Sequence, residues 1–252
     1  MSSMIKNLEK KVVLVSGAGK GIGKEIALTF AAAGSKVAFF DKNQKAVEQV
    51  EKELGLLKEK FLAATVDIED FPAVARFISL VKTRLGPIDI LINNVGIGLV
   101  KKFFQTSETD YDRVLNTNFK GPFFLTQSVS REMKEGDSII FITSIHAEHP
   151  SLDPTYDASK AAINSLVANL ALELAPKGVR VNAVAPGHID VETKSLARPQ
   201  PDVPLSKKAG LPKDVAEACL FLADNEKAPY LTGVILPVTG GLHLPIAKDI
   251  DF

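Results

Sequence analysis

Short apolar runs alternate along the chain with longer segments in which apolar residues recur at helical spacing. Several runs are apolar at successive positions, as expected for parallel strands that helices cover on both faces. The predicted strands lie at 12–16, 36–40, 61–66, 88–92, 138–143, 179–184 and 233–237. The predicted helices span 21–33, 43–54, 71–85, 108–133, 154–174 and 212–223.

This alternation predicts an α/β fold: a doubly wound, Rossmann-type three-layer sandwich with a seven-stranded parallel sheet. No internal repeat and no long Gly/Ser linker divides the chain, so we expect one domain over residues 1–252. The stretch 188–204 lacks clear periodicity and is rich in proline near its end, which is typical of a substrate loop. We expect His243 and the C-terminal tail, 242–252, to take part in subunit contacts.

Composition and charge exclude several classes of function. The 30 basic residues balance 30 acidic ones, so no positive field attracts nucleic acid or an anionic membrane. Cys219 is the only cysteine, which excludes an internal disulfide and a thiolate metal cluster. No apolar stretch is long enough for a bilayer, and residues 1–11 lack a signal-peptide core. We therefore expect a cytoplasmic protein.

A glycine-rich turn, Ser-Gly-Ala-Gly-Lys-Gly-Ile-Gly, follows the first predicted strand and opens the first helix. Glycines allow the backbone to turn tightly and to approach a phosphate, which then meets the amides at the helix N-terminus. The spacing of Gly17, Gly21 and Gly23 differs from the common Gly-x-Gly-x-x-Gly fingerprint, and a purely structural turn is an alternative. Its place between a strand and a helix favours a dinucleotide site.

Asp41 ends the second predicted strand, eighteen residues after Gly23. A carboxylate there can accept both adenosine-ribose hydroxyls and repels a 2′-phosphate, which favours NAD over NADP. A structural aspartate at a strand end is the alternative, and Lys20 or Lys42 could instead neutralise a 2′-phosphate. We give Asp41 more weight because its repulsion acts at the hydroxyl itself.

Two further segments suit the same ligand. Asp67, after the third strand, can accept the adenine amino group. The sequence Asn93-Asn94-Val95-Gly96 brings small and polar groups to the crevice where the strand order should reverse.

Tyr156 and Lys160 are four residues apart on a predicted helix and therefore share one face. Free tyrosine has a pKa near 10, too high for a base at neutral pH, and a nearby ammonium lowers it. A pKa near 7 requires about 4 kcal/mol of differential stabilisation, which we ascribe to Lys160 together with the positive nicotinamide. Ser144, after the fifth strand, is placed to hold a substrate oxygen beside Tyr156, although helix capping is an alternative role.

Pro122 interrupts a long helical pattern. It has no amide hydrogen, so the carbonyl of Asn118 loses its helical partner. We expect a kink with a trapped water that passes protons from Lys160 to solvent. A kink that merely suits the packing is the alternative.

Assembled, these residues resemble the short-chain dehydrogenase/reductase family, in its single-domain branch. The similarity runs from about residue 11 to 241 and includes the glycine turn, Asp67, the 93–96 segment, Asn118, Ser144, the Tyr156 and Lys160 pair, Pro186-Gly187 and Thr239-Gly240-Gly241. The resemblance implies a catalytic tetrad of Asn118, Ser144, Tyr156 and Lys160, with Tyr156 as general acid/base. It implies that Lys160 also binds the nicotinamide ribose, that Asn118 anchors a water relay, and that helices 108–133 and 154–174 pair in a homotetramer. The expected cofactor-binding residues are Ser16, Gly17, Lys20, Gly21, Ile22, Gly23, Asp41, Asp67, Ile68, Asn94, Tyr156, Lys160, Pro186, Gly187 and Ile189.

The sequence departs from the family pattern at three places. Ser16 replaces the preferred threonine, and Val95 replaces the usual alanine. After Ile189, the family has a threonine where this chain has Val191, so a hydroxyl is missing there, although Thr193 is a possible substitute. The 188–204 loop is also short, which suggests an open pocket.

The substrate side carries His146, Glu148, His149 and Asp153 close to Ser144. This segment is similar to a Ser-x-His-Glu stretch of sugar dehydrogenases in the family, and such groups can bind a hydroxyl-rich ligand. A solvent-facing polar loop is the alternative. We expect no metal, because no further ligand cluster supports zinc at the two histidines.

The leading hypothesis is an oxidoreductase that transfers a hydride between NAD(H) and a secondary alcohol or sugar hydroxyl, or the corresponding carbonyl. One alternative is a 3-oxoacyl thioester reductase that uses NADPH, against which Asp41 counts. The other is a catalytically silent NAD(P)-binding sensor or scaffold, and such proteins typically lose members of the tetrad. The sequence leaves the substrate, the direction and the stereochemistry open.

Overall fold

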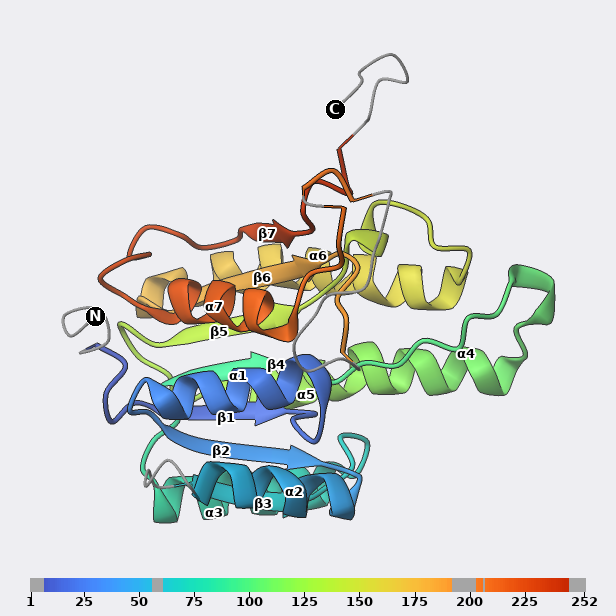
Figure 1. Cartoon of the computed structure of the whole chain (residues 1–252). Coiled ribbons are helices and arrows are strands. Elements are labelled where there is room, and N and C mark those ends of the chain that lie inside the picture. Colours follow the sequence, from blue (N-terminus) through green and yellow to red (C-terminus); the bar gives the residue numbers. More distant parts are fainter. Residues whose placement is uncertain (1–6, 56–60, 192–202, 206, 245–252) are drawn as a thin grey trace.

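Seven parallel strands form one sheet in the order β3-β2-β1-β4-β5-β6-β7 (Figure 1). The computed structural model describes residues 7–55, 61–191, 203–205 and 207–244. Its strands are β1 (Val12–Ser16), β2 (Lys36–Asp41), β3 (Phe61–Thr65), β4 (Ile90–Asn93), β5 (Ser138–Ile142), β6 (Arg180–Pro186) and β7 (Ile235–Val238). The predicted fold class is confirmed, and each predicted strand is found with its ends shifted by no more than two residues.

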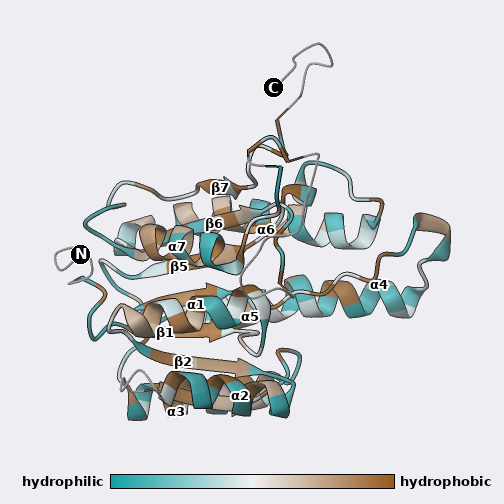
Figure 2. Ribbon diagram, in the orientation of Figure 1, coloured by the Kyte–Doolittle hydropathy of each residue, from teal (hydrophilic) through white to brown (hydrophobic). Residues whose placement is uncertain are grey.

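Helices cover both faces of this sheet and bury two separate apolar cores. Residues of β1 alternate between them: Val13 and Val15 pack into one core, and Val12 and Leu14 into the other. Burial on both faces explains why the strands read as continuous apolar runs, which Figure 2 shows as brown arrows between mixed helices. The first core packs against α1 (Gly21–Ala32), α2 (Gln44–Gly55) and α7 (Pro212–Ala223), and the second against α3 (Phe71–Arg84), α5 (Gly121–Ser130) and α6 (Pro154–Leu174).

The predicted helix 108–133 is in fact two helices joined by a π-helical turn. α4 (Glu108–Leu115) leads into the turn Asn116–Lys120, and α5 follows. The amide of Gly121 bonds back to the carbonyl of Asn116, five residues earlier. The predicted interruption at Pro122 is therefore confirmed, and its form is a wider helical turn that buries Asn118 completely.

The strand order places a switch point between β1 and β4. From β1 the chain first builds outward to β3, then crosses back to β4 and continues to β7. Helices leave these two neighbouring strands on opposite faces, so a crevice opens at their carboxyl ends, where α/β folds bind ligands. The α4 helix and the loop before it extend beyond this edge (Figure 1).

Parts of two predicted segments lie outside the described residues. Of the 188–204 loop, the structure describes 188–191 and 203–204, and of the tail it describes 242–244. Among the helices that it describes, none has the length and apolar character needed to cross a bilayer.

Replacing Gly121 with Ala tests the packing at the π turn. A Cβ there would lie 2.6 Å from Cγ1 of the buried Ile68. We expect Gly121→Ala to lower the free energy of unfolding by about 1–2 kcal/mol, an overpacking cost partly offset by better helix propensity. Urea denaturation measures it. Gly55→Ala is the control, because a Cβ at Gly55 meets nothing within 4 Å, and an equal loss in both variants would contradict the prediction.

Candidate active site

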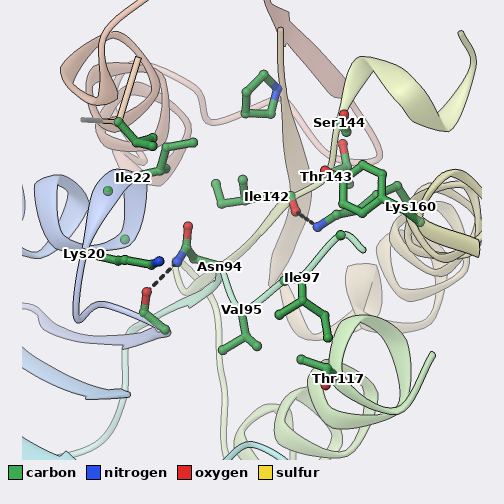
Figure 3. Close-up of a pocket in the computed structure, with 18 of the residues that line it drawn as sticks. Lys20, Ile22, Asn94, Val95, Ile97, Thr117, Ile142, Thr143, Ser144 and Lys160 are labelled. Atoms are coloured by element: carbon green, nitrogen blue, oxygen red, sulfur yellow. Dashed lines mark hydrogen bonds between the residues drawn. The ribbon is translucent and has the colours of Figure 1, made fainter. Parts of the chain in front are cut away.

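One pocket of about 1020 Å³ at the carboxyl edge of the sheet unites the two halves of the predicted site. In Figure 3, Lys20 and Ile22 lie on one side of it, and Ser144 and Lys160 lie on the other. The predicted site residues that line it are Gly17, Lys20, Gly21, Ile22, Gly23, Asp41, Asp67, Ile68, Asn94, Ser144, Tyr156, Lys160, Pro186, Gly187 and Ile189. Ser16 and Asn118 do not line it.

The glycine turn depends on backbone positions that exclude side chains. Gly17 and Gly21 have φ angles of 66° and 55°, the left-handed region. A Cβ on Gly23 would lie 2.3 Å from Nδ2 of Asn94. That amide donates to the carbonyl oxygens of Gly17 at 2.8 Å and Ser16 at 3.2 Å, so Asn94 braces the turn.

Ser16 takes a supporting place instead of the predicted cofactor contact. Its hydroxyl accepts a hydrogen bond from the amide of Asn94 at 3.1 Å and is fully buried. The reason is the strand register: β1 ends at Ser16, and its side chain points to β4 and not to the crevice.

The start of α1 fits a bound phosphate. Its N-cap residue, Lys20, has an extended backbone and makes no side-chain capping bond, and the first turn contains no acidic residue. The first amides of a helix need acceptors, and an anion gains from the positive end of the helix dipole. With the glycine cradle beside it, this helix start suits the pyrophosphate of a dinucleotide.

Asp41 is fixed beside the glycine turn by two backbone amides. Its Oδ2 accepts from Gly19 at 3.0 Å, and its Oδ1 accepts from Asn43 at 3.0 Å. A Cβ on Gly19 would lie 2.8 Å from the carboxylate, so a fourth glycine of the turn also makes room for its neighbour. Gly19 is not among the residues predicted for the site, although it belongs to the glycine cluster in the sequence. Lys20 and Lys42 line the same pocket.

Ser144, Tyr156 and Lys160 meet at the opposite end of the pocket. Ser144 caps the short helical turn Ile145–Ala147, where its hydroxyl accepts from the amide of His146 at 3.1 Å, and the same hydroxyl is close enough to the phenol of Tyr156 to favour its ionised form. Lys160 is buried, and its Nζ donates to the carbonyl of Ile142 at 2.9 Å (Figure 3). The same nitrogen lies 5.7 Å from the centre of the Tyr156 ring.

Burial controls the protonation of this pair. It raises the pKa of Tyr156 above its usual value. The neighbouring hydroxyl of Ser144 opposes this only in part, and the charges of Asp157 and Asp153 add to it. Burial also lowers the pKa of Lys160 to about 8. The sequence predicted that Lys160 together with a positive nicotinamide lowers the pKa of Tyr156. Without a bound nucleotide, burial is the largest cause and raises that pKa, and Nζ of Lys160 is engaged by the carbonyl of Ile142.

Asn118 hydrogen-bonds the backbone of Ile97, which lines the pocket. Its Oδ1 accepts from the amide of Ile97, and its Nδ2 donates to the carbonyl of the same residue, both at 2.8 Å. Its Nδ2 also donates to Ser159 at 3.0 Å. A Cβ on Gly96 would lie 3.1 Å from Nζ of Lys160 and 3.8 Å from Oδ1 of Asn118, so both side chains converge there. The water relay stays a prediction.

Polar and apolar residues both line the substrate side of the pocket, and Asp153 of the predicted polar cluster is among them. His146 lines it, with Nδ1 2.9 Å from the carbonyl oxygen of His149, whereas Glu148 and His149 are exposed and do not line it. The predicted polar cluster is thus divided between pocket and solvent. Thr193 lies outside the described residues. Val95 and Val191, which depart from the family pattern, also line this side. Sequence patterns gave no signal for its remaining residues: Ile97, Gly98, Val100, Thr143 and Ser151.

The chain is similar to known proteins over almost its whole length. The family profile described as short chain dehydrogenase matches residues 11–202. A 7alpha-hydroxysteroid dehydrogenase of Escherichia coli (strain K12) is 37% identical over 243 residues, which cover 93% of this chain and 94% of that protein. The 3-oxoacyl-(acyl-carrier-protein) reductase FabG of Thermotoga maritima is 35% identical (93% and 98% covered), and a 2-dehydro-3-deoxy-D-gluconate 5-dehydrogenase of Pseudoalteromonas atlantica is 36% identical (93% and 96%).

Solved structures share this fold. A 7 alpha-hydroxysteroid dehydrogenase complexed with NADH and 7-oxo glycochenodeoxycholic acid superposes with a TM-score of 0.87 at 36% identity, covering 96% of this chain and 97% of that one. A short chain dehydrogenase from Burkholderia cenocepacia J2315 in complex with NADP gives a TM-score of 0.86 at 29% identity, with 94% and 99% covered. Relatives of this fold thus bind either nucleotide.

The buried ammonium makes a testable contribution to stability. Burial lowers the pKa of Lys160 from 10.5 to about 8, so unfolding takes up a proton between pH 8 and pH 10.5. Below pH 8 the buried ammonium therefore lowers the free energy of unfolding of the wild type by its full desolvation cost. We expect Lys160→Met to raise the free energy of unfolding at pH 7 by about 1–2 kcal/mol, the desolvation cost less the lost hydrogen bond. The gain should vanish towards pH 10.5.

Urea denaturation at pH 7 and pH 10, without nucleotide, measures this difference. Lys45→Met, at an exposed position on α2, is the control and should change stability by less than about 0.5 kcal/mol. A gain for Lys160→Met that is the same at both pH values would contradict the explanation by desolvation.

Proposed function

The chain belongs to the short-chain dehydrogenase/reductase family, as an oxidoreductase that acts on hydroxyl or carbonyl groups, and we propose that it transfers a hydride between NAD(H) and a secondary alcohol or sugar hydroxyl. One observation carries the proposal. A single pocket joins a phosphate-binding helix start to Ser144, Tyr156 and Lys160. That arrangement brings a nucleotide and a substrate oxygen together, and Tyr156 is the general acid/base.

Ser144 and Tyr156 hold the substrate oxygen in this mechanism. Both hydroxyls line the same end of the pocket, so an alcohol or carbonyl oxygen bound there can receive two hydroxyl partners. Because burial keeps the phenol of Tyr156 protonated, it is ready to donate a proton to the oxygen of a carbonyl that is being reduced. In the opposite direction the phenolate accepts the alcohol proton, and a bound nicotinamide supplies hydride acceptance and positive charge.

Lys160 supports the proton transfer through its charge. Its Nζ is held on the carbonyl of Ile142, beside the backbone of Gly96. With a pKa of about 8, it is mostly protonated at neutral pH and can still release a proton within the working range. We propose that the path from Lys160 to solvent passes the π turn at Asn118.

A 3-oxoacyl thioester reductase that uses NADPH is the second candidate. The Thermotoga reductase, which is 35% identical, favours it, and Asp41 counts against it. The apolar lining formed by Ile97, Val100 and Val191 suits a hydrocarbon body better than a fully hydroxylated one. We would assay cyclohexanol, 2-decalinol, galactitol, gluconate and acetoacetyl-coenzyme A with both nucleotides, because the order of activity separates these classes.

We further propose a homotetramer that pairs α4 and α5 with α6 between subunits. Exposed apolar side chains on these helices support it: Tyr111 on α4, Phe124 on α5 and Leu172 on α6. Light scattering after size exclusion measures the assembly.

Asp41 should select the nucleotide. We expect wild-type kcat/KM to be higher with NAD(H) than with NADP(H), and Asp41→Asn to lower that ratio about tenfold, since one repulsion at the 2′-phosphate disappears. Asparagine retains an acceptor for the amides of Gly19 or Asn43, and any damage to the turn cancels in the ratio. A wild-type preference for NADP(H) would reverse the assignment.

Tyr156→Phe should abolish turnover and leave nucleotide binding intact. We expect kcat to fall by roughly 10²- to 10⁴-fold, the contribution of a general acid/base, while the Kd for NADH, measured by its fluorescence, changes little. Tyr230→Phe is the control, because Tyr230 is 99% exposed. Retained activity in the Tyr156 variant would refute the mechanism.

A further inference from the structure

One carboxylate joins the substrate side of the pocket to the helix that carries Tyr156. Asp153 is the N-cap of α6, and its Oδ1 accepts from the amide of Tyr156 at 3.3 Å. Its Oδ2 accepts from two amides of a distant loop, Leu99 at 3.0 Å and Val100 at 2.7 Å. Asp153 is only 6% exposed, so these bonds are shielded from water. The side chain therefore does more than cap a helix.

The residues that it holds form a wall of the pocket, which we call the wall segment (residues 97–100). At one end Asn118 binds both the amide and the carbonyl of Ile97, and at the other end Asp153 binds Leu99 and Val100. Between them the backbone lies against the reacting tyrosine. A Cβ on Gly98 would lie 3.5 Å from Cδ2 of Tyr156 and 3.6 Å from Oδ2 of Asp153.

Val100 shows that the wall segment is held under strain. Its φ angle is 52°, a left-handed conformation that a β-branched residue strongly disfavours. Its side chain is 90% exposed, so burial of the valine does not compensate for this conformation. The hydrogen bonds to the Asp153 carboxylate are charge-assisted and short, and they are the contacts that oppose relaxation. Strain of this kind tends to persist at functional sites.

We propose that Asp153 is a positioning residue that holds the wall segment in place relative to Tyr156. The proposal deepens the proposed function and rests on it, since the wall segment borders the place where the alcohol or carbonyl would bind. Because Asp153 contacts the wall and not the nucleotide-binding turn, its loss should weaken substrate binding and spare nucleotide binding.

Asp153→Ser isolates the wall contacts. Serine caps helices as well as aspartate does, but its single oxygen cannot serve both Tyr156 and the wall amides. Hydrogen exchange followed by mass spectrometry on the full-length protein should show the amides of Leu99 and Val100 exchanging about tenfold faster, as expected for a lost hydrogen bond to a charged group. Asp70→Ser, at the N-cap of α3, is the matched control and should leave these amides unchanged.

Kinetics provide the second readout. With the most active alcohol of the panel above, Asp153→Ser should raise KM about tenfold and change kcat and the Kd of NADH by less than about threefold. Asparagine tolerates left-handed backbone better than valine does. In a Val100→Asn background we therefore expect the rise in KM caused by Asp153→Ser to shrink below about threefold. An equal rise in both backgrounds would show that Asp153 only caps α6 and would overturn the proposal.

The exchange experiment needs no turnover, so it separates the two proposals. Unchanged exchange at Leu99 and Val100 in Asp153→Ser would overturn the role of Asp153, whatever the enzyme's substrate. Absence of turnover across the panel, with faster exchange at these amides, would refute the proposed function alone. If Asp153→Ser does not fold, as judged by circular dichroism, Asp153→Asn replaces it in both arms with the same expected directions.

Discussion

The crevice between the carboxyl ends of β1 and β4 is the constraint on which the rest of the structure depends. The two strands are hydrogen-bonded neighbours, yet the helices that follow them leave on opposite faces of the sheet. Neither the glycine turn nor the polar segment after β4 fills the gap, so a pocket remains. Asn94, which follows β4, donates to the carbonyl oxygens of Ser16 and Gly17 and so ties the glycine turn to the neighbouring strand.

At the catalytic end of the pocket, burial disfavours the charged forms of both Tyr156 and Lys160. Tyr156 and Lys160 would both be more easily ionised in water, and the same desolvation pushes the pKa of the phenol up and that of the ammonium down. The two shifts leave the pair with a neutral acid and an ammonium that is close to releasing its proton. Near neutral pH the phenol is therefore a protonated acid that can donate a proton, and Lys160 is the member of the pair that can release and regain one.

Two irregular backbone conformations shape the substrate side of the pocket. The π turn buries Asn118 and directs its amide to Ile97, and a strained Val100 ends the same segment. Both departures from regular geometry cost conformational free energy and are stabilised by side chains from elsewhere in the chain. The wall segment is therefore hydrogen-bonded at both ends. The opposite border, formed by Ile189 and Val191, belongs to a segment that the described residues cover only in part.

The sequence by itself determined the features that local physics controls. Apolar runs and helical spacing predicted the order of strands and helices, the glycine cluster predicted the phosphate turn, and a four-residue interval placed Lys160 on the face of Tyr156. The break near Asn118 was also predictable, because the missing amide of Pro122 acts within one turn of helix.

Only the tertiary structure decided the features that join distant residues. Asp153 contacts Val100 from 53 positions away, Asn94 reaches Gly17 from 77, and no local pattern encodes either contact. The direction of the Tyr156 pKa shift likewise depends on burial, which no local sequence pattern shows. Spacing along the chain placed the reactive groups, whereas packing in three dimensions decided their protonation and the shape of the pocket around them.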